Sequence, residues 1–467
     1  GGQNNYVPLD AAPSWPILLF TLAVSMLTGV VFGIVPAWLA SRVDPAEALR
    51  GAGRAIGAGR SWTQKSLVVA QIALSIVLLS AAALLGQSLR NLEHQNFGFE
   101  TKDRYIAWIN PQLGNYKAEQ MEPMFRQIDE RLLQIPGMRM VAPALYAPMT
   151  GDSWNNGVRI EGRPEPGAKE DSSAGFVRVT PGFFEAIGAK IVLGRSLSER
   201  DTAATRPVAV VNQAFANRFF KGQNPIGQHF GPGKSKYSAT FEIVGVSSDV
   251  RYMTYSYKDP VRPMYWVPET QTAQFDDPGF QATEISSHYL YNIVLWTVGN
   301  PPDIEARVRK ALAEVDPNLV LYGVDRYSQV VSADFQQEKL IATLTALFGV
   351  LGLVLAAVGL FGVLAYTVER RTGEIGVRMA LGANRAHVIA MVLESAFWQV
   401  GIGLAIGIPA AIAAGRLMSA QLFGVEPWDP VMLTVTTLLL GFATLTAALI
   451  PAWRASCVEP MVALRTE

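Results

Sequence analysis

The stretch RRTGEIGVRMALGAN, residues 370–384, decides the fold predicted for this chain. It is short, charged and punctuated by glycine, and it lies between two long apolar runs. Its charged residues Arg371, Glu374 and Arg378, with Arg385 just beyond it, follow steps of three, four and seven residues, which place them on one helical face. The stretch therefore predicts a short surface helix that lies against a membrane.

The ends of this helix carry stop and start signals. Gly382 can end it, and Asn384 can cap a following helix. Val377, Met379 and Ala380 lie away from the centre of the charged face. The residues alone leave one alternative open, an ordinary basic loop, because basic residues gather in the cytoplasmic loops of membrane proteins.

Composition places the chain in a membrane. It has 467 residues, half of them hydrophobic, and 39 basic side chains balance 39 acidic ones. Net charge therefore gives no sign of nucleic-acid binding, and we expect no nucleic-acid partner. Five stretches carry no charged residue, and each reaches the length of about 20 residues that spans a bilayer core. They are residues 16–40, 66–89, 340–368, 395–415 and 430–453. The expected fold is membrane α-helical with five transmembrane helices.

The single cysteine, Cys457, excludes an intramolecular disulfide, so any domain outside the membrane needs its own apolar core. The first residue is Gly, and no basic residue precedes the first apolar run as a signal peptide would require. We therefore expect the sequence to be part of a longer chain.

The distribution of basic residues predicts the orientation. Arg and Lys gather between the first and second runs, between the third and fourth runs, and in the tail, whereas the loop after the fourth run has only Arg416. Basic loops are cytoplasmic, so by parity residues 91–338 are extracytoplasmic. Long domains cross membranes regardless of their charge, and the mixed charge of this segment agrees with that placement.

An internal repeat links the two ends of the chain. Residues 36–50 read PAWLASRVDPAEALR and residues 451–465 read PAWRASCVEPMVALR, with ten of fifteen positions identical. The motif is marked by Pro36, Trp38, Pro45, Pro451, Trp453 and Pro460. Each copy follows an apolar run, so we expect residues 1–54 to be the last helix and tail of an upstream repeat. The second repeat then begins with an elbow and helix over residues 60–90.

Small residues pattern two of the runs. Gly349, Gly352 and Gly359 recur along the third run, and Gly403 and Gly407 form G-x-x-x-G in the fourth. Small faces let helices approach closely in lipid. We expect these glycines to serve packing within the chain rather than a substrate path.

The extracytoplasmic segment reads as α+β. Met121, Met124, Phe125, Ile128 and Leu132 follow the spacing of an amphipathic helix. Strands are expected over residues 105–110, 207–212, 241–246, 291–298 and 319–322, and a helix over residues 302–315. Residues 334–339 run into the third apolar run without a breaker, which predicts a helical stalk.

No motif for catalysis or cofactor binding was found. The stretch GQHFGPGKS, residues 227–235, misses a phosphate-binding loop because Gln228 stands where glycine is needed and Pro232 removes a backbone N–H. The four histidines show no ligand spacing, and no nucleophile motif occurs. We expect a turn at 227–235, no metal or cofactor bound by this chain, and no enzyme active site.

The pattern R-T-x-E-I-G-x-R-x-A-L-G-A resembles the cytoplasmic coupling segment of ABC transporter permeases of the MacB and FtsX type. Residues 60–89 resemble the first helix and elbow of that family, and residues 176–195 and 208–228 resemble its periplasmic core domain. The resemblance implies a MacB-like core domain over residues 91–338 and an FtsX-like permease domain with three helices over residues 339–467. With its extra leading helix and repeated tail motif, the chain resembles the duplicated permeases of acidobacteria, in which two such halves share one chain.

The resemblance implies a permease of the bacterial inner membrane that couples ATP hydrolysis by a separate cytoplasmic ATPase to movement of its outer domain, in export or efflux. The implied contact residues are Arg371, Glu374, Ile375, Gly376, Arg378, Leu381 and Gly382. Other implied partners are the upstream repeat and a periplasmic adaptor or outer-membrane channel. Unlike the family's macrolide exporter, this sequence carries no ATPase. Transmembrane signalling to a periplasmic partner and a passive membrane-tethered scaffold remain alternatives.

Overall fold

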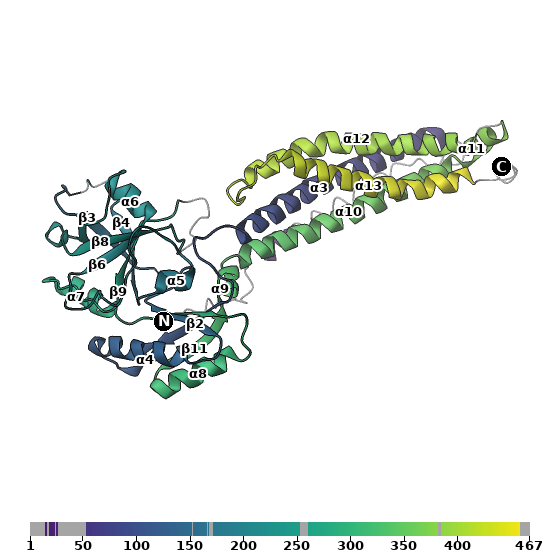
Figure 1. The fold of residues 1–467 in the computed structure, drawn as a ribbon. Coiled ribbons are helices and arrows are strands. Elements are labelled where there is room, and N and C mark those ends of the chain that lie inside the picture. The colour runs from purple at the N-terminus through teal and green to yellow at the C-terminus, as the bar shows by residue number, and fades with distance from the viewer. Residues whose placement is uncertain are drawn as a thin grey trace. The chain divides into compact units, whose positions relative to one another are not determined.

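The computed structural model describes residues 15, 18–23, 25–26, 53–151, 153–165, 167, 171–252, 260–381 and 384–457. Within these ranges Asn91–Gln337 form one compact unit, the outer unit, and the segments before Asn91 and from Glu338 onward form another, the membrane unit. Figure 1 shows the strands gathered in the outer unit and the long helices in the membrane unit.

The membrane unit consists of helices. They are α3 (Gly53–Glu93), α10 (Gln336–Arg370), α11 (Thr372–Ala380), α12 (Arg385–Leu417) and α13 (Pro430–Ser456). The described residues include four segments long and apolar enough to cross a membrane, Gln64–Glu93, Gln336–Arg370, Arg385–Leu417 and Pro430–Ser456. The fifth expected span, residues 16–40, falls mostly outside the described residues, so the count of five stays a prediction.

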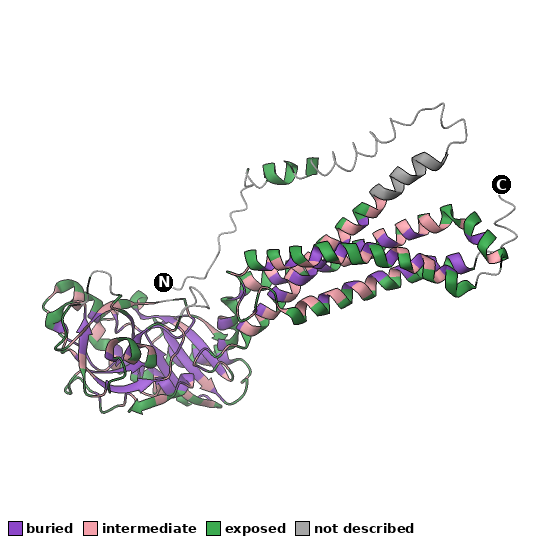
Figure 2. Cartoon of the chain, turned by 90° about the horizontal axis from the view of Figure 1, so that it is seen from above, coloured by how far each residue is buried: buried purple, intermediate pink, exposed green. Residues whose placement is uncertain are grey.

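The outward faces of these helices are apolar, as lipid requires. Leu347 is 62% exposed on α10, Phe397 72% on α12 and Phe442 69% on α13. Figure 2 shows exposed and partly exposed residues along the outer sides of the long helices, with buried residues between them. Water would penalise so much exposed apolar surface, whereas lipid tails do not.

The first part of the outer unit, here the first lobe, is a four-stranded antiparallel sheet with two helices. Its elements are β1 (Arg104–Asn110), α4 (Met121–Leu133), β2 (Met138–Ala144), β10 (Asn292–Thr297), α8 (Ile304–Val315) and β11 (Val320–Arg326). The strand order is β11-β1-β10-β2. The two strands of each βαβ unit are therefore separated by one strand of the other unit. This is a ferredoxin-like βαββαβ arrangement, interrupted between β2 and β10 by a long insertion.

The helix α4 forms where the sequence predicts an amphipathic helix. The five apolar residues expected on one face, Met121, Met124, Phe125, Ile128 and Leu132, are its buried residues. The helix packs against α8 and β2. The local 3.6-residue period is thus explained by burial against one sheet face.

The insertion, residues 145–291, contains the other strands. They are β3 (Asn155–Ile160), β4 (Ser173–Val179), β5 (Ile191–Gly194), β6 (Val208–Asn212), β7 (His229–Pro232), β8 (Phe241–Ser247) and β9 (Met264–Pro268). Pairings run β4-β3-β7-β8-β6-β9, and β9 pairs back to β4, so six strands close into a ring. Closure removes the edges that an open sheet would expose. Rings of Phe230, Tyr265 and Phe215 pack at centroid distances of 5.0 to 6.3 Å.

Short helices complete the outer unit. They are α5 (Phe183–Ile187), α6 (Gln213–Phe220), α7 (Pro278–Ser286), α9 (Tyr327–Ala333) and the 3-10 helices Pro111–Gly114, Ala118–Gln120 and Ser235–Tyr237. The last of these begins at the final residue of the GQHFGPGKS stretch, where the Lys234 ammonium pairs with Asp277 at 2.6 Å. The centre of the stretch is strand β7, which pairs with β3 and β8, so the expectation of a turn over residues 227–235 was wrong there, and the chain turns or bends only near the ends of the stretch.

The predicted stalk is only partly present. Helix α10 does begin before the apolar run, at Gln336, but Asp334 and Phe335 form a turn that separates it from α9. Phe335 is 2% exposed, and its ring stacks on Phe97 at 5.9 Å. Burying this ring in the outer unit turns the chain, so a continuous helix over residues 334–339 was the wrong expectation.

Candidate functional site

The predicted coupling stretch forms the short helix α11 between two long helices. α10 ends at Arg370, and the backbone carbonyl of Arg371 accepts from Ile375 N at 2.8 Å. The Thr372 hydroxyl donates to Glu369 O at 2.7 Å, which secures the turn between the helices. Asn384 is the N-cap residue of α12, as the sequence indicates, although its side chain makes no capping hydrogen bond. Gly382 lies outside the described residues.

One face of α11 is buried. Ile375 is 2% exposed, and Gly376 is also buried. Ile375 belongs to a core cluster with Leu364 of α10 and Val388 of α12, and the cluster also contains residues of α3 and α13. Two members of the predicted contact set therefore point into the helix bundle. They can anchor α11, but they cannot meet a partner without unpacking it.

The opposite face of α11 is charged and exposed. The Glu374 Oε1 atom lies 2.7 Å from Arg378 Nη2, and both side chains are half exposed. Arg378 Nη1 also lies 3.5 Å from Met391 Sδ of α12. Arg371 is exposed as well, and Leu381 beyond the helix is 83% exposed. The exposed face thus presents side chains of both charges beside the apolar Leu381. The opposite face of the helix is held in the bundle by Ile375.

The predicted packing glycines lie against α3. A Cβ at Gly349 or Gly352 of α10 would meet Leu78 O at 3.5 Å or Ser75 Oγ at 3.4 Å, and one at Gly359 would meet Gln71 Oε1 at 2.6 Å. The Ser75 hydroxyl donates to Gly352 O at 2.9 Å.

The glycines of α12 face α3 as well. A Cβ at Gly403 would lie 2.6 Å from Ile72 Cγ2, and one at Gly407 would lie 2.9 Å from Ala73 Cα. Helix α3 therefore lies between α10 and α12, and glycines let both approach it closely.

Of the repeated tail motif, only Pro451 and Trp453 lie in the described residues. Pro451 is buried inside α13, which continues to Ser456, and Trp453 is 71% exposed. Pro36, Trp38, Pro45 and Pro460 lie outside the described residues.

The outer unit contains buried polar groups that the sequence did not reveal. Arg178 is fully buried and bonds Glu284 Oε1 at 2.6 Å, Ser287 Oγ at 2.8 Å and Pro268 O at 2.8 Å. Burying this pair without such bonds would be costly. Its members are 106 residues apart, and no local pattern could have paired them.

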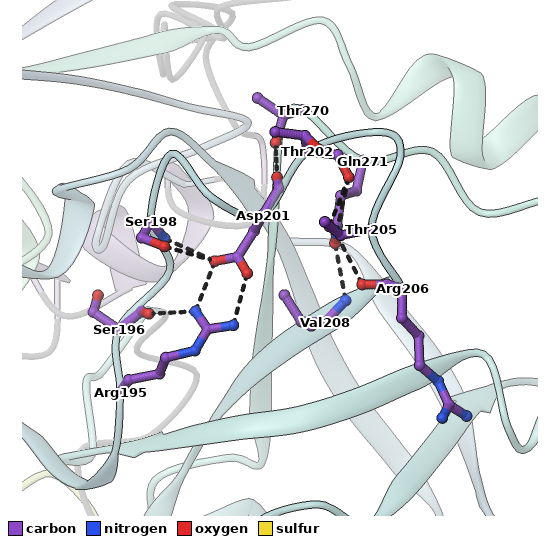
Figure 3. A network of polar contacts seen from close by, with 10 residues as sticks. All are labelled: Arg195, Ser196, Ser198, Asp201, Thr202, Thr205, Arg206, Val208, Thr270 and Gln271. Carbon is purple, nitrogen blue, oxygen red and sulfur yellow. Dashed lines mark hydrogen bonds and ion pairs between the residues drawn. The ribbon is translucent and has the colours of Figure 1, made fainter.

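A second polar network fixes the segment before β6 (Figure 3). Arg195 forms a bidentate pair with Asp201 at 2.7 and 2.8 Å. The Gln271 side-chain amide donates to Thr205 Oγ1 at 2.8 Å and accepts from Val208 N at 2.9 Å. These bonds hold residues 195–208 against the segment that follows β9.

The described residues hold no group of three or more His, Cys, Asp or Glu side chains that could bind a metal ion. One cavity, of about 20 Å³, lies among Phe176, Phe241, Tyr265, Phe280 and Glu284 in the insertion. Such a volume has room for about one water molecule.

The four long helices, the anchored charged helix between two of them, and the α+β unit carried between α3 and α10 define an integral membrane protein of the permease type. The model of the MacB-like periplasmic core domain matches residues 66–315, more than half of the 467-residue chain, and the chain belongs to this family. The model of the FtsX-like permease C-terminal domain matches residues 346–460, which include α11.

Two curated relatives are longer than this chain. A probable export ATP-binding/permease protein of Pseudomonas fluorescens (strain Pf0-1) is 26% identical over 291 residues, which are 60% of this chain and 42% of that protein. The macrolide export ATP-binding/permease protein MacB of Vibrio parahaemolyticus is 25% identical over 310 residues, 64% of this chain and 43% of that protein. The chain thus spans about two fifths of the length of these relatives.

The crystal structure of the periplasmic region of MacB from Actinobacillus actinomycetemcomitans is also similar. It shares 14% identity and a TM-score of 0.32, and the match covers 53% of this chain and 98% of that one.

Proposed function

We propose that this chain is the permease part of an ABC-type export system of the bacterial inner membrane. A separate cytoplasmic ATPase binds and hydrolyses ATP, and the membrane unit carries the resulting movement to the outer unit. The names of the two relatives pair an ATP-binding function with a permease function and with export, which supports this reading.

The observation that carries the proposal is the two-sided character of α11. Glu374 and Arg378 are half exposed on one side, while Ile375 is buried on the other in a cluster shared with all four long helices. A force applied to the exposed face would therefore reach α3, α10, α12 and α13 through packed side chains, which transmit displacement because interiors are dense. A passive anchor has no need of such a helix.

The exposed Leu381, 83% accessible, lies next to this charged face. Interfaces commonly join an apolar contact with surrounding charges, and complementary charge fixes the register of the partner. The partner we expect here is the ATPase subunit, with Arg371, Glu374, Arg378 and Leu381 in contact and Ile375 as the anchor.

The test is the charge reversal Glu374→Lys. In the fold alone, an exposed i, i+4 pair contributes only about 0.5 kcal/mol, so the variant should insert and fold normally. At a docked interface the same reversal can cost roughly 2 to 5 kcal/mol. We expect loss of the ATPase subunit from the purified complex and loss of permease-dependent ATP turnover.

The chain supplies a matched control in Glu305→Lys. Glu305 and Arg309 form an i, i+4 pair at 2.7 Å with half-exposed side chains, nearly the same geometry as Glu374 and Arg378, but on α8 of the outer unit. This variant should keep the ATPase. If Glu374→Lys also retains the subunit and its turnover at wild-type level, α11 has no docking role.

A further inference from the structure

The chain enters the outer unit after α3 and leaves it before α10, and the two connections pack on each other. The rings of Phe97 and Phe335 stack at 5.9 Å, and those of Phe99 and Tyr327 stack at 5.0 Å. All four side chains are at most 8% exposed. We call these four residues the aromatic clasp. Phe97 follows the last residue of α3 by four positions, and Phe335 directly precedes α10.

The clasp is also bonded to the insertion. The Tyr327 hydroxyl donates to Pro148 O at 2.9 Å, and Arg251 N donates to Phe97 O at 2.9 Å. Gly98 has φ +81°, and a Cβ there would overlap Asp249 O and lie 3.1 Å from Val250 Cα. Only glycine fits this close approach.

The two segments of the insertion that the clasp contacts, near Pro148 and near Arg251, are also hydrogen-bonded to each other. Met149 N donates to Tyr252 O at 2.9 Å, which links the segment after β2 to the segment after β8. Met149 is buried and has φ +60°, a costly conformation for a side chain of this size. The chain crosses from the first lobe into the insertion at this place, so the clasp is attached where the two parts of the outer unit meet.

We propose that the aromatic clasp passes movement of α3 and α10 to the insertion, and that the Tyr327 hydroxyl is a positioning group in this step. The inference rests on the proposed function, because it needs a driven movement of the two helices. The covalent path from either helix reaches the clasp within a few residues. Since the rings are packed and the Tyr327 bond is direct, a displacement of one connection shifts Pro148 and Arg251 together.

The experiment uses the full chain with its ATPase in lipid nanodiscs. Cys457 is replaced by Ser, and spin labels are placed at Asn217→Cys on α6 and Lys310→Cys on α8, both exposed positions. The distance between the labels is compared with and without ATP, and ATP turnover is measured on the same samples. Tyr327→Phe removes one hydroxyl and leaves the stacked ring in place.

Loss of a buried neutral hydrogen bond that forms in only one of two states changes the ratio of those states by about fivefold. We expect Tyr327→Phe to shift the ATP-dependent distance populations by about this factor while ATP turnover stays at the wild-type level. The matched control is Tyr289→Phe, because the Tyr289 hydroxyl also donates to one backbone carbonyl, Tyr116 O at 2.8 Å, but outside the clasp. The control should respond to ATP like the wild type.

A second variant, Phe335→Leu, keeps an apolar side chain and removes one stacked pair. It should also reduce the ATP-dependent change in the distance between the labels. Agreement of the two variants would show that the effect comes from the clasp and not from the Tyr327 hydroxyl alone. A merely structural clasp would lower thermal stability in both variants without changing the ATP response, and that result would overturn the inference while leaving the proposed function intact. If the wild type itself shows no ATP-dependent change, the proposed function fails, and the inference fails with it.

Discussion

Glu269 is a buried acidic residue, and its surroundings in the folded chain disfavour the ionised carboxylate. Its side chain is 4% exposed, and its Oε1 atom has no hydrogen-bond partner among the described residues. Burial, and then the nearby Glu122 carboxylate, raise the pKa of Glu269 from 4.5 to about 8. Burial, with Glu269 next in importance, likewise raises the pKa of Asp129 well above its usual range.

The raised pKa fixes the sign of a pH effect on stability. Between pH 4.5 and 8 the unfolded chain has Glu269 ionised while the folded chain keeps it protonated. The unfolded state then binds fewer protons, so stability falls as pH rises through this window. The difference between a pKa of 4.5 and one of about 8 corresponds to a loss of at most about 5 kcal/mol of folding stability. This loss is absent below pH 4.5 and complete above pH 8.

Glu269→Gln should remove this pH dependence because glutamine is neutral throughout. Allowing for an unpaired amide, we expect the variant to be about 2 to 4 kcal/mol more stable than the wild type at pH 8 and no more stable at pH 4.5. Unfolding of the full chain in detergent would be followed by tryptophan fluorescence from pH 4.5 to 8.5. Trp266, fully buried in the same strand region, reports on this part of the fold.

The control is Glu305→Gln, at a half-exposed acid of the same unit, which should change stability by no more than about 0.5 kcal/mol at any pH. Equal stability of Glu269→Gln and the wild type at pH 8 would refute the assignment of a protonated, buried Glu269.

Two further predictions concern the membrane unit. Gly407→Leu should separate α12 from α3 and reduce the yield of folded protein in size-exclusion chromatography, whereas Gly401→Leu, at a position with open space around its Cβ, should leave that yield unchanged; equal yields would contradict the packing described. Cys457 is exposed, and a thiol reagent that cannot cross membranes should label it only in inverted vesicles or lysed cells. Labelling in intact spheroplasts would reverse the predicted orientation.

The features that were predicted correctly from the sequence are local. The buried face of α4, the helix α11 and the close approach of the glycines Gly403 and Gly407 all follow from spacing along one helix. These features depend on residues within a few turns of each other, which is the range that periodicity reports.

Features that depend on distant residues were out of reach. The ring of six strands requires the parallel pairing of β4 with β9, whose segments are separated by most of the insertion. The burial of Arg178 is visible only once Glu284 and the carbonyl of Pro268 are in place. Ile375 was expected at a partner contact because the sequence does not show which side of α11 the neighbouring helices cover.

The same long-range features bear on how the outer unit can move. A closed ring of strands has no free edge at which to shear, and the Arg195–Asp201 pair and Gln271 fasten the segment before β6 to it (Figure 3). Deformation inside the insertion would break several buried bonds at once, each worth about 1 kcal/mol or more. Its junction with the first lobe is bonded too: α5 packs on β2 and β10, the Arg104 guanidinium donates to Ala186 O, and Thr180 N donates to Pro143 O. Because the ring itself resists deformation, an ATP-dependent change in the distance between labels on α6 and α8 would report movement at this junction rather than inside the insertion.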